Sequence, residues 1–170
     1  MRRTAIPALF HLLLLLLILA PGQGLCFSAR LERAIDGDSL ILALQDGHRE
    51  EVRLIGLDTP ELEQEWGQAA REYSRTFCSG GRLEVALDKE QRDHYGRLLA
   101  YVWRDGKMLN EALLEAGLAV ILPIKPNTVF ARRFRAAQER AQAGQQGFWA
   151  QGGLQLSPSR NPNTKPSGTI

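Results

Sequence analysis

One arginine limits the possible folds of this chain more than any other residue. The run 52–57, Val-Arg-Leu-Ile-Gly-Leu, otherwise has the composition of a buried β-strand, and Arg53 interrupts it. Successive side chains of a strand point to opposite faces, so Arg53 is expected to share a face with Ile55 and Leu57. Because arginine is almost never fully buried without a partner, an anion should meet it there. The acidic segment 58–61, Asp-Thr-Pro-Glu, therefore indicates a site for an anionic substrate and a cation.

The N-terminal segment 1–24 has the layout of a secretory signal peptide. Arg2 and Arg3 precede an apolar stretch at 5–20, and the small residues of 22–24 offer a cleavage pattern. The apolar stretch is shorter than the roughly 20 residues of a membrane span. We expect export to the periplasm or the extracellular space after cleavage. Retention of the segment as an uncleaved membrane anchor is the alternative.

The same segment carries the chain's excess of positive charge. The sequence has 21 Lys and Arg against 19 Asp and Glu, and residues 1–24 contribute two arginines and no acid. Without them the counts are equal, at 19 each. Net charge therefore gives no argument for nucleic-acid binding, and the local arrangement of charges must carry that case.

Two cysteines, Cys26 and Cys78, would remain after cleavage of the segment. An exported chain meets an oxidising compartment, where cysteine pairs tend to form. We therefore predict a disulfide between them, with two free thiols as the alternative.

Short apolar runs alternate with turns in the first part of the remaining chain. The runs 30–35 and 39–44 are joined by Asp-Gly-Asp at 36–38, and Asp-Gly between such runs is a strong hairpin signal. A second turn at 45–48 leads into the run 51–57. The pattern predicts a three-stranded meander.

The later part of the chain predicts helices and two more strands. Helices are expected at 67–79, at 108–116 and from 130 to a stop at Gly144, and strands at 83–87 and 98–103. Five strands and three helices favour an α+β fold, a small five-stranded OB-fold barrel with three α-helices packed around it. The order of the strands does not follow from the pattern. A tail at 151–170, rich in Gly, Pro, Ser and Asn, is expected to be disordered.

Four polar segments carry candidate functional groups, and each has an ordinary structural explanation when taken alone. They are Asp36-Gly37-Asp38, Arg53, Asp58-Thr59-Pro60-Glu61 and His94-Tyr95-Gly96-Arg97. A hairpin turn, an ion pair, a capped connection and an exposed turn would account for them in that order. Their combination is more specific than any one of them.

Taken in order, these segments resemble the staphylococcal nuclease (thermonuclease) family. The resemblance continues through the segments 105–113, 117–119 and 125–127 and Trp149, and covers roughly residues 28–150. It implies an OB-fold nuclease domain at 25–150 that hydrolyses phosphodiester bonds of DNA and RNA with Ca²⁺ and little sequence specificity. A monomer with no obligate protein partner is expected. The alternative is a non-catalytic nucleic-acid-binding OB-fold module.

The resemblance also implies a metal site. Asp38 and Asp58 would hold Ca²⁺ through their carboxylates, with help from the backbone carbonyl of Thr59, and Asp36 would support them from nearby. Hard oxygen ligands suit this cation, which accepts a loose shell completed by water and phosphate.

The remaining implied roles concern the substrate. Glu61 would activate or orient the attacking water. Arg53 and Arg97 would bind the scissile phosphate and stabilise the negative charge that grows on it in the transition state. The planar fork of arginine can make two parallel bonds to phosphate, so lysine should replace it poorly.

Base contacts are where this chain departs from the family. Tyr95 is expected to pack against the nucleotide, and His94, also a substrate contact, stands where the family archetype has lysine. The segment 120–124 has no tyrosine before the Lys-Pro-Asn turn. Base stacking contributes about 1–3 kcal/mol per base, so these departures weaken the expected base contacts.

Overall fold

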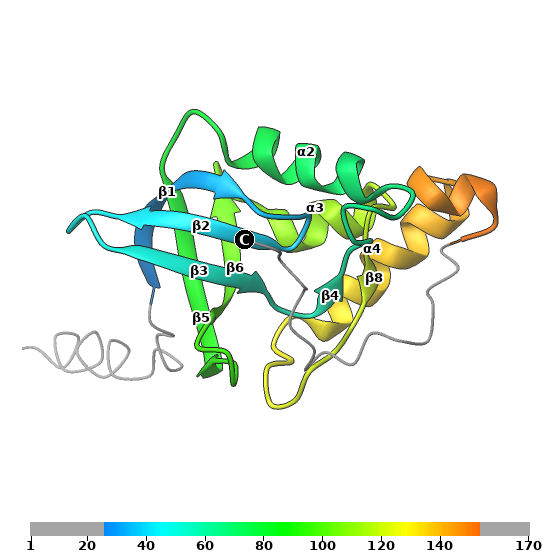
Figure 1. Ribbon diagram of the computed structural model, residues 1–170. Helices are drawn as coiled ribbons and strands as arrows, with labels where there is room; N and C mark the ends of the chain where they lie inside the picture. Colours follow the sequence, from blue (N-terminus) through cyan, green and yellow to red (C-terminus); the bar gives the residue numbers. More distant parts are fainter. Residues whose placement is uncertain (1–25, 154–170) are drawn as a thin grey trace, which may run out of the picture.

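The computed structural model describes residues 26–153, so the segment 1–24 and the tail from 154 onward lie outside the described residues. Its elements in chain order are β1 (Cys26–Ala34), β2 (Ser39–Leu44), β3 (Arg49–Leu54), β4 (Leu57–Asp58), α2 (Gly67–Cys78), β5 (Leu83–Arg92), β6 (Leu98–Arg104), β7 (Lys107–Met108), α3 (Leu109–Glu115), β8 (Val120–Ile121), α4 (Ala131–Ala143) and the 3₁₀ turn η1 (Gly147–Gln151) (Figure 1). Within these residues, no helix has the length and apolar character needed to cross a membrane.

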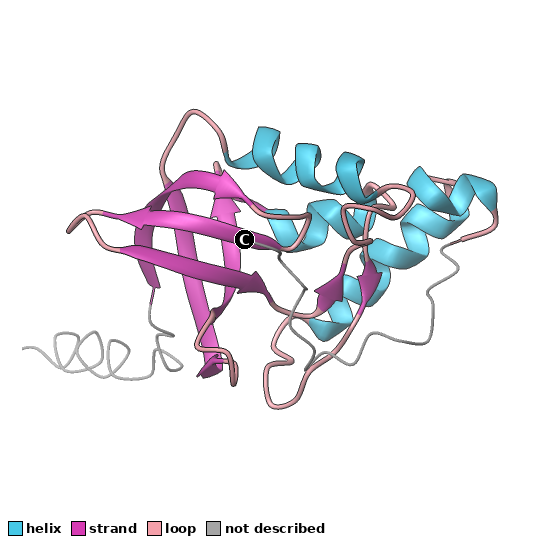
Figure 2. Cartoon of the chain, viewed as in Figure 1, coloured by secondary structure: helices cyan, strands magenta, loops and turns pink. Residues whose placement is uncertain are grey.

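Five strands close into a barrel. Antiparallel neighbours follow the order β3-β2-β1-β5-β6, and a parallel pairing of β3 with β6 joins the two edges. The helices lie to one side of the barrel, and α3 packs against both β6 and α4 (Figure 2). The predicted α+β fold, an OB-fold barrel with three helices, is confirmed.

The expected helices agree with α2, α3 and α4 to within a residue at each end. The run 51–57, however, is not a single strand. β3 ends at Leu54, Gly56 adopts a φ of 85°, and β4 then pairs with β8. Glycine takes such a backbone conformation without steric cost, so the chain turns here. The expectation that Arg53 shares a strand face with Ile55 and Leu57 is therefore wrong.

Asn110 joins the start of α3 to the barrel. Its side chain is fully buried, and its Oδ1 accepts the backbone N–H of Val102 at 3.1 Å. Its Nδ2 donates to the carbonyls of Ile55 at 3.0 Å and Ala100 at 3.3 Å. A single amide thus satisfies backbone groups of β6 and of the turn that follows β3.

Both cysteines are free in the structure, so the predicted disulfide between Cys26 and Cys78 is not present. Cys26 is exposed at the start of β1, whereas Cys78 is buried at the end of α2. Burial raises the pKa of the Cys78 thiol to about 12, which keeps it protonated and unreactive.

Candidate functional site

Arg53 sits between two buried carboxylates. Its Nη1 forms an ion pair with Oδ2 of Asp38, and its Nη2 lies 2.8 Å from Oδ1 of Asp58. All three residues are less than a tenth exposed. Burial alone would lower the pKa of Arg53, but the charges of Asp38 and Asp58 raise it above its ordinary value. The anion that a buried arginine requires is therefore supplied by two aspartates that the family resemblance assigns to the cation.

The turn between β1 and β2 places Asp38. Oδ1 of Asp36 accepts the backbone N–H groups of Asp38 at 2.9 Å and Ser39 at 2.7 Å, which fixes the turn. Oδ2 of Asp38 in turn accepts the backbone N–H of Thr59 at 2.8 Å. This last bond connects the first acidic segment to the second.

Gly37 lets these two segments approach each other closely. A Cβ built at this position would lie 2.7 Å from both Oγ1 of Thr59 and Cβ of Ala70, closer than real Cβ contacts. The Asp-Gly pair predicts a hairpin, but the glycine is needed for space against Thr59 and α2 rather than for the turn itself.

Three carboxylates, those of Asp36, Asp38 and Asp58, surround the single guanidinium of Arg53. Burial and the nearby charge of Asp38 raise the pKa of Asp36 to about 7. This excess of negative charge and the set of hard oxygen donors fit a divalent cation such as Ca²⁺. No group of three His, Cys, Asp or Glu side chains arranged for a metal occurs within residues 26–153, so other oxygens would have to complete the coordination.

Arg97 reaches the same pocket as Arg53. The two side chains line a hollow of about 170 Å³, together with Glu90, Asp93, His94, Leu99 and Ile124. The parallel pairing of β3 with β6 explains the meeting, because it places Arg53 beside Leu99, two residues after Arg97. Arg53 and Arg97 therefore line one hollow, and their predicted role at a shared phosphate stays a prediction.

Asp93 orients Arg97, a role that sequence reasoning missed. Its Oδ2 accepts the Nε–H of Arg97 at 2.7 Å, and its Oδ1 accepts the backbone N–H groups of Tyr95 and Arg97, each at 3.0 Å. The guanidinium carbon of Arg97 also lies 5.5 Å from the centre of the Tyr95 ring. The available signal was an aspartate at the start of the turn between β5 and β6, where Asp commonly accepts the backbone N–H two residues on.

Of the other predicted site residues near the substrate, one lines this pocket and two do not. His94 lines the pocket, and its ring centre lies 3.7 Å from that of Tyr95, which is not among the pocket's lining residues. Glu61 is half-buried in the connection to α2, and it is also outside the lining. Gly67 fixes that connection, since a Cβ there would lie 1.8 Å from the Glu61 carbonyl oxygen.

Ser74 is a supporting residue that sequence reasoning also missed. It is fully buried on α2, and its hydroxyl donates to the carbonyl of Gly37 at 2.6 Å. Arg71, one turn earlier, donates from Nε to the carbonyl of Ala34 at 3.1 Å. The signal was a serine four residues after Ala70, on the apolar side of the helix.

A family model described as staphylococcal nuclease homologue matches residues 51–151. The chain belongs to the staphylococcal nuclease family. The enzyme class predicted from the sequence, a hydrolase that acts as a nuclease, is confirmed at that level.

Curated relatives support the assignment. The thermonuclease of Staphylococcus hyicus is 36% identical over 124 residues, which cover 69% of this chain and 73% of the relative. The thermonuclease of Staphylococcus intermedius is 39% identical over the same length and coverage. Endonuclease YncB of Bacillus subtilis is 37% identical over 140 residues, covering 78% of this chain but 66% of the relative.

Proposed function

We propose that this chain is a Ca²⁺-dependent endonuclease that hydrolyses DNA and RNA with little sequence specificity. The observation that carries the proposal is the convergence of Asp38 and Asp58 on Arg53, in a pocket shared with Arg97. The names of the relatives, thermonuclease and endonuclease, support the reaction class. Nucleic-acid strands are the corresponding substrates, and the proposed active form is a monomer.

Asp38 and Asp58 would hold the cation, with the backbone carbonyl of Thr59 as a further oxygen ligand. The hydrogen bond from Thr59 to Asp38 keeps these groups adjacent. When bound, Ca²⁺ supplies positive charge that polarises the phosphate oxygens and makes a nearby water more acidic. Asp36 would support the site by holding the turn that carries Asp38.

Arg53, on β3, and Arg97, in the turn just before β6, would bind the scissile phosphate. Hydrolysis adds negative charge to the oxygens around phosphorus, and fixed cationic donors stabilise that charge more than the ground state. Arg97 is already oriented by Asp93, so little rearrangement is needed when substrate binds.

Glu61 would orient the attacking water or accept its proton. A carboxylate within hydrogen-bonding reach of the attacking water can serve in either way. Its connection to α2 is fixed by the close packing against Gly67, which limits how far the side chain can move.

Metal removal tests the proposal directly. The purified chain should degrade single-stranded DNA and RNA oligonucleotides when Ca²⁺ is present and should stop when a chelator is added, because two carboxylates of the site would lose their shared cation. Gel analysis of end-labelled oligonucleotides measures both rates. Readdition of Ca²⁺ is the control for irreversible damage. Absence of cleavage across metals and pH, with nucleic-acid binding retained, would instead support a non-catalytic binding module.

Export by the segment 1–24 is part of the proposal. The charged start, the apolar stretch and the small residues that follow support it. Intact mass spectrometry of protein recovered from outside the cytoplasm should show a chain that lacks the segment 1–24. An intact N-terminus in the membrane fraction would favour the anchor instead.

A further inference from the structure

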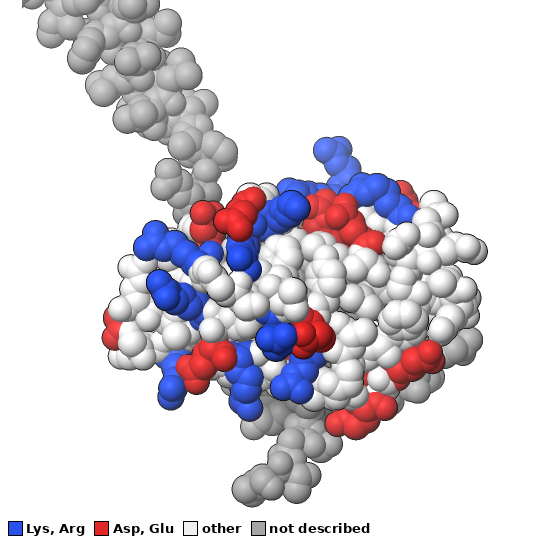
Figure 3. All heavy atoms as spheres, turned by 90° about the horizontal axis from the view of Figure 1, so that it is seen from above, with Lys and Arg blue, Asp and Glu red and all other residues white. Residues whose placement is uncertain are grey.

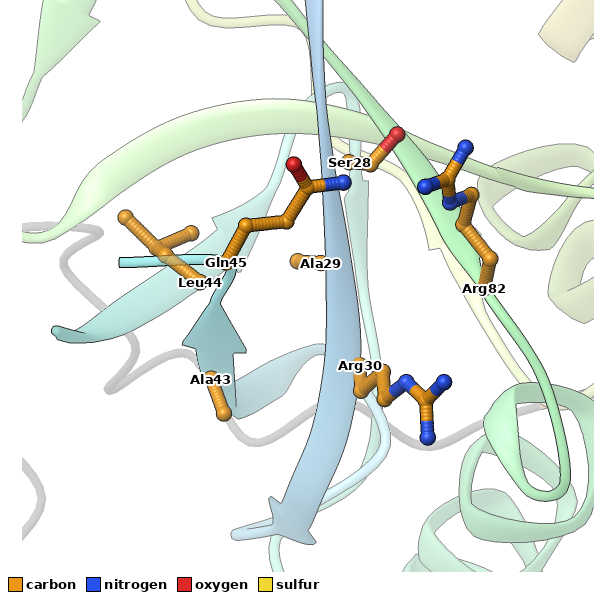
Figure 4. Close-up of a pocket in the computed structure, with 7 residues that line it drawn as sticks. All are labelled: Ser28, Ala29, Arg30, Ala43, Leu44, Gln45 and Arg82. Carbon is orange, nitrogen blue, oxygen red and sulfur yellow. The ribbon is translucent and has the colours of Figure 1, made fainter. Parts of the chain in front are cut away.

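A second hollow lies at the end of the barrel away from the acidic turn at 36–38, which joins β1 to β2. It has a volume of about 420 Å³ and is lined by Ser28, Ala29, Arg30, Ala43, Leu44, Gln45 and Arg82. Figure 4 shows the two arginines extending on the same side of β1. Ser28 and Gln45 add a hydroxyl and an amide. Two guanidinium groups with neutral hydrogen-bond donors are the combination that recognises phosphate.

The two arginines of this hollow, Arg30 and Arg82, are not neutralised by carboxylates of the described chain. Both are exposed, and within residues 26–153 neither forms an ion pair. Glu84 stands opposite Ser28 in the β1–β5 register and does not line the hollow, and Glu32 on β1 is paired with Arg49. Their positive charge is therefore available to a ligand.

Further basic residues continue from this hollow along β1 toward the acidic turn. A hollow of about 310 Å³ further along β1 is lined by Arg33 and Arg71, and also by the paired residues Glu32 and Arg75. A β-bulge between Leu31 and Arg33 breaks the strand alternation there, and Arg33 is exposed without an ion pair in the described part of the chain. The side chain of Arg71 donates to the backbone carbonyl of Ala34, two residues before the acidic turn at 36–38.

The acidic residues of this face are largely neutralised by other partners. Glu32 pairs with Arg49 at 2.6 Å, and Glu72 pairs with Arg75 on α2. Asp105 lies 3.4 Å from Arg104. Figure 3, which views the molecule from above, shows Lys and Arg side chains over the barrel half with Asp and Glu side chains between them. The net result is a basic path from Arg82 to Arg71.

The length of this path matches a nucleic-acid strand rather than a single nucleotide. From Arg30 to Asp36 the chain advances about 20 Å at the usual rise of a strand. Stacked nucleotides rise about 3.4 Å each along the strand axis, so about six nucleotides span the path. A dinucleotide has only one phosphodiester bond and cannot occupy both ends.

We propose that the hollow of Arg30 and Arg82 is an accessory binding site for the phosphodiester backbone of the substrate strand, beyond the bond that is cut. The inference rests on the proposed nuclease function, because it assumes that the strand is bound at the acidic site. Accessory phosphate contacts increase affinity for long strands without a change in the chemical step, since they are equal in the ground and transition states.

The test compares the double variant Arg30→Ala/Arg82→Ala with the wild type on a dinucleotide and on a 16-nucleotide single strand. In the full chain, KM for the long strand should rise about fivefold to tenfold while kcat is kept, because two phosphate contacts are lost. KM for the dinucleotide should change by less than about twofold. Long-strand binding is also followed by fluorescence anisotropy in chelator at several salt concentrations. The slope of log K against log salt concentration should become shallower by about 1.4 in the variant.

The matched control is Arg132→Ala/Arg135→Ala, which removes the same charge from two exposed arginines of α4. An equal loss of long-strand affinity in this control, or no loss in the Arg30/Arg82 variant, overturns the proposal. Equal losses on both substrates also overturn it. If the wild type cuts neither substrate, the nuclease function fails, and the anisotropy slopes still decide whether the accessory site binds phosphate.

Discussion

Replacing Arg53 with lysine is expected to lower kcat by about 100-fold to 1,000-fold, the usual loss for one missing donor to transition-state charge. The two Nη atoms of Arg53 meet different carboxylates, Asp38 and Asp58. A lysine ammonium is a single point of charge and cannot reproduce this fork or offer parallel bonds to a phosphate. Steady-state cleavage of a defined oligonucleotide in excess Ca²⁺ measures the loss.

Lysine is the informative substitution because it keeps the charge. Arg53→Ala would leave two buried carboxylates without their partner, and breaking such a pair costs about 3–5 kcal/mol of stability. The ammonium group of lysine still compensates the negative charges of Asp38 and Asp58, so the variant should remain folded. Arg49→Lys, on the same strand but exposed and paired with Glu32, is the matched control and should keep its turnover. Near-native kcat in Arg53→Lys would remove Arg53 from the transition-state role.

Local sequence pattern was sufficient to predict the three helices and the need of Arg53 for an anion. The helices follow from apolar spacing, and the burial of an arginine in a strand requires a charged partner. The route of the chain after Arg53 was not predictable in this way. The turn at Gly56 depends on a positive φ that glycine allows but does not require.

The meeting of Arg53 with Arg97 depends on long-range closure of the barrel. The two residues come together only because β3 and β6 pair in parallel across the barrel. Periodicity reports which face of a strand is buried, but not which distant strand lies beside it. The family resemblance supplied this proximity, whereas the spacing of the residues did not.

Buried polar residues were the other gap in the sequence prediction. Ser74 and Asn110 occupy positions where the pattern alone predicts apolar packing, and each bonds a carbonyl distant in sequence. Such residues are visible in a sequence only as polar interruptions of an apolar face. Their partners are backbone groups, which carry no sequence signal.

Asn110→Ala should destabilise the fold strongly, lowering the free energy of unfolding by about 3 kcal/mol. The variant leaves the N–H of Val102 and the carbonyl of Ile55 without the bonds that Asn110 provides, in a fully buried place. Urea unfolding followed by circular dichroism measures the loss. Gln142→Ala, which removes an exposed amide on α4, is the control and should change stability by less than about 0.5 kcal/mol.

The same variant separates stability from chemistry. The hydrogen bonds of Asn110 go to the backbone of Val102, Ile55 and Ala100, so kcat below the unfolding transition should stay close to that of the wild type. Arg53→Lys should show the opposite combination, in which the protein stays folded but kcat falls. If Asn110→Ala also lost turnover while fully folded, the turn at Ile55 would have to position the site directly. The two residues would then no longer act independently.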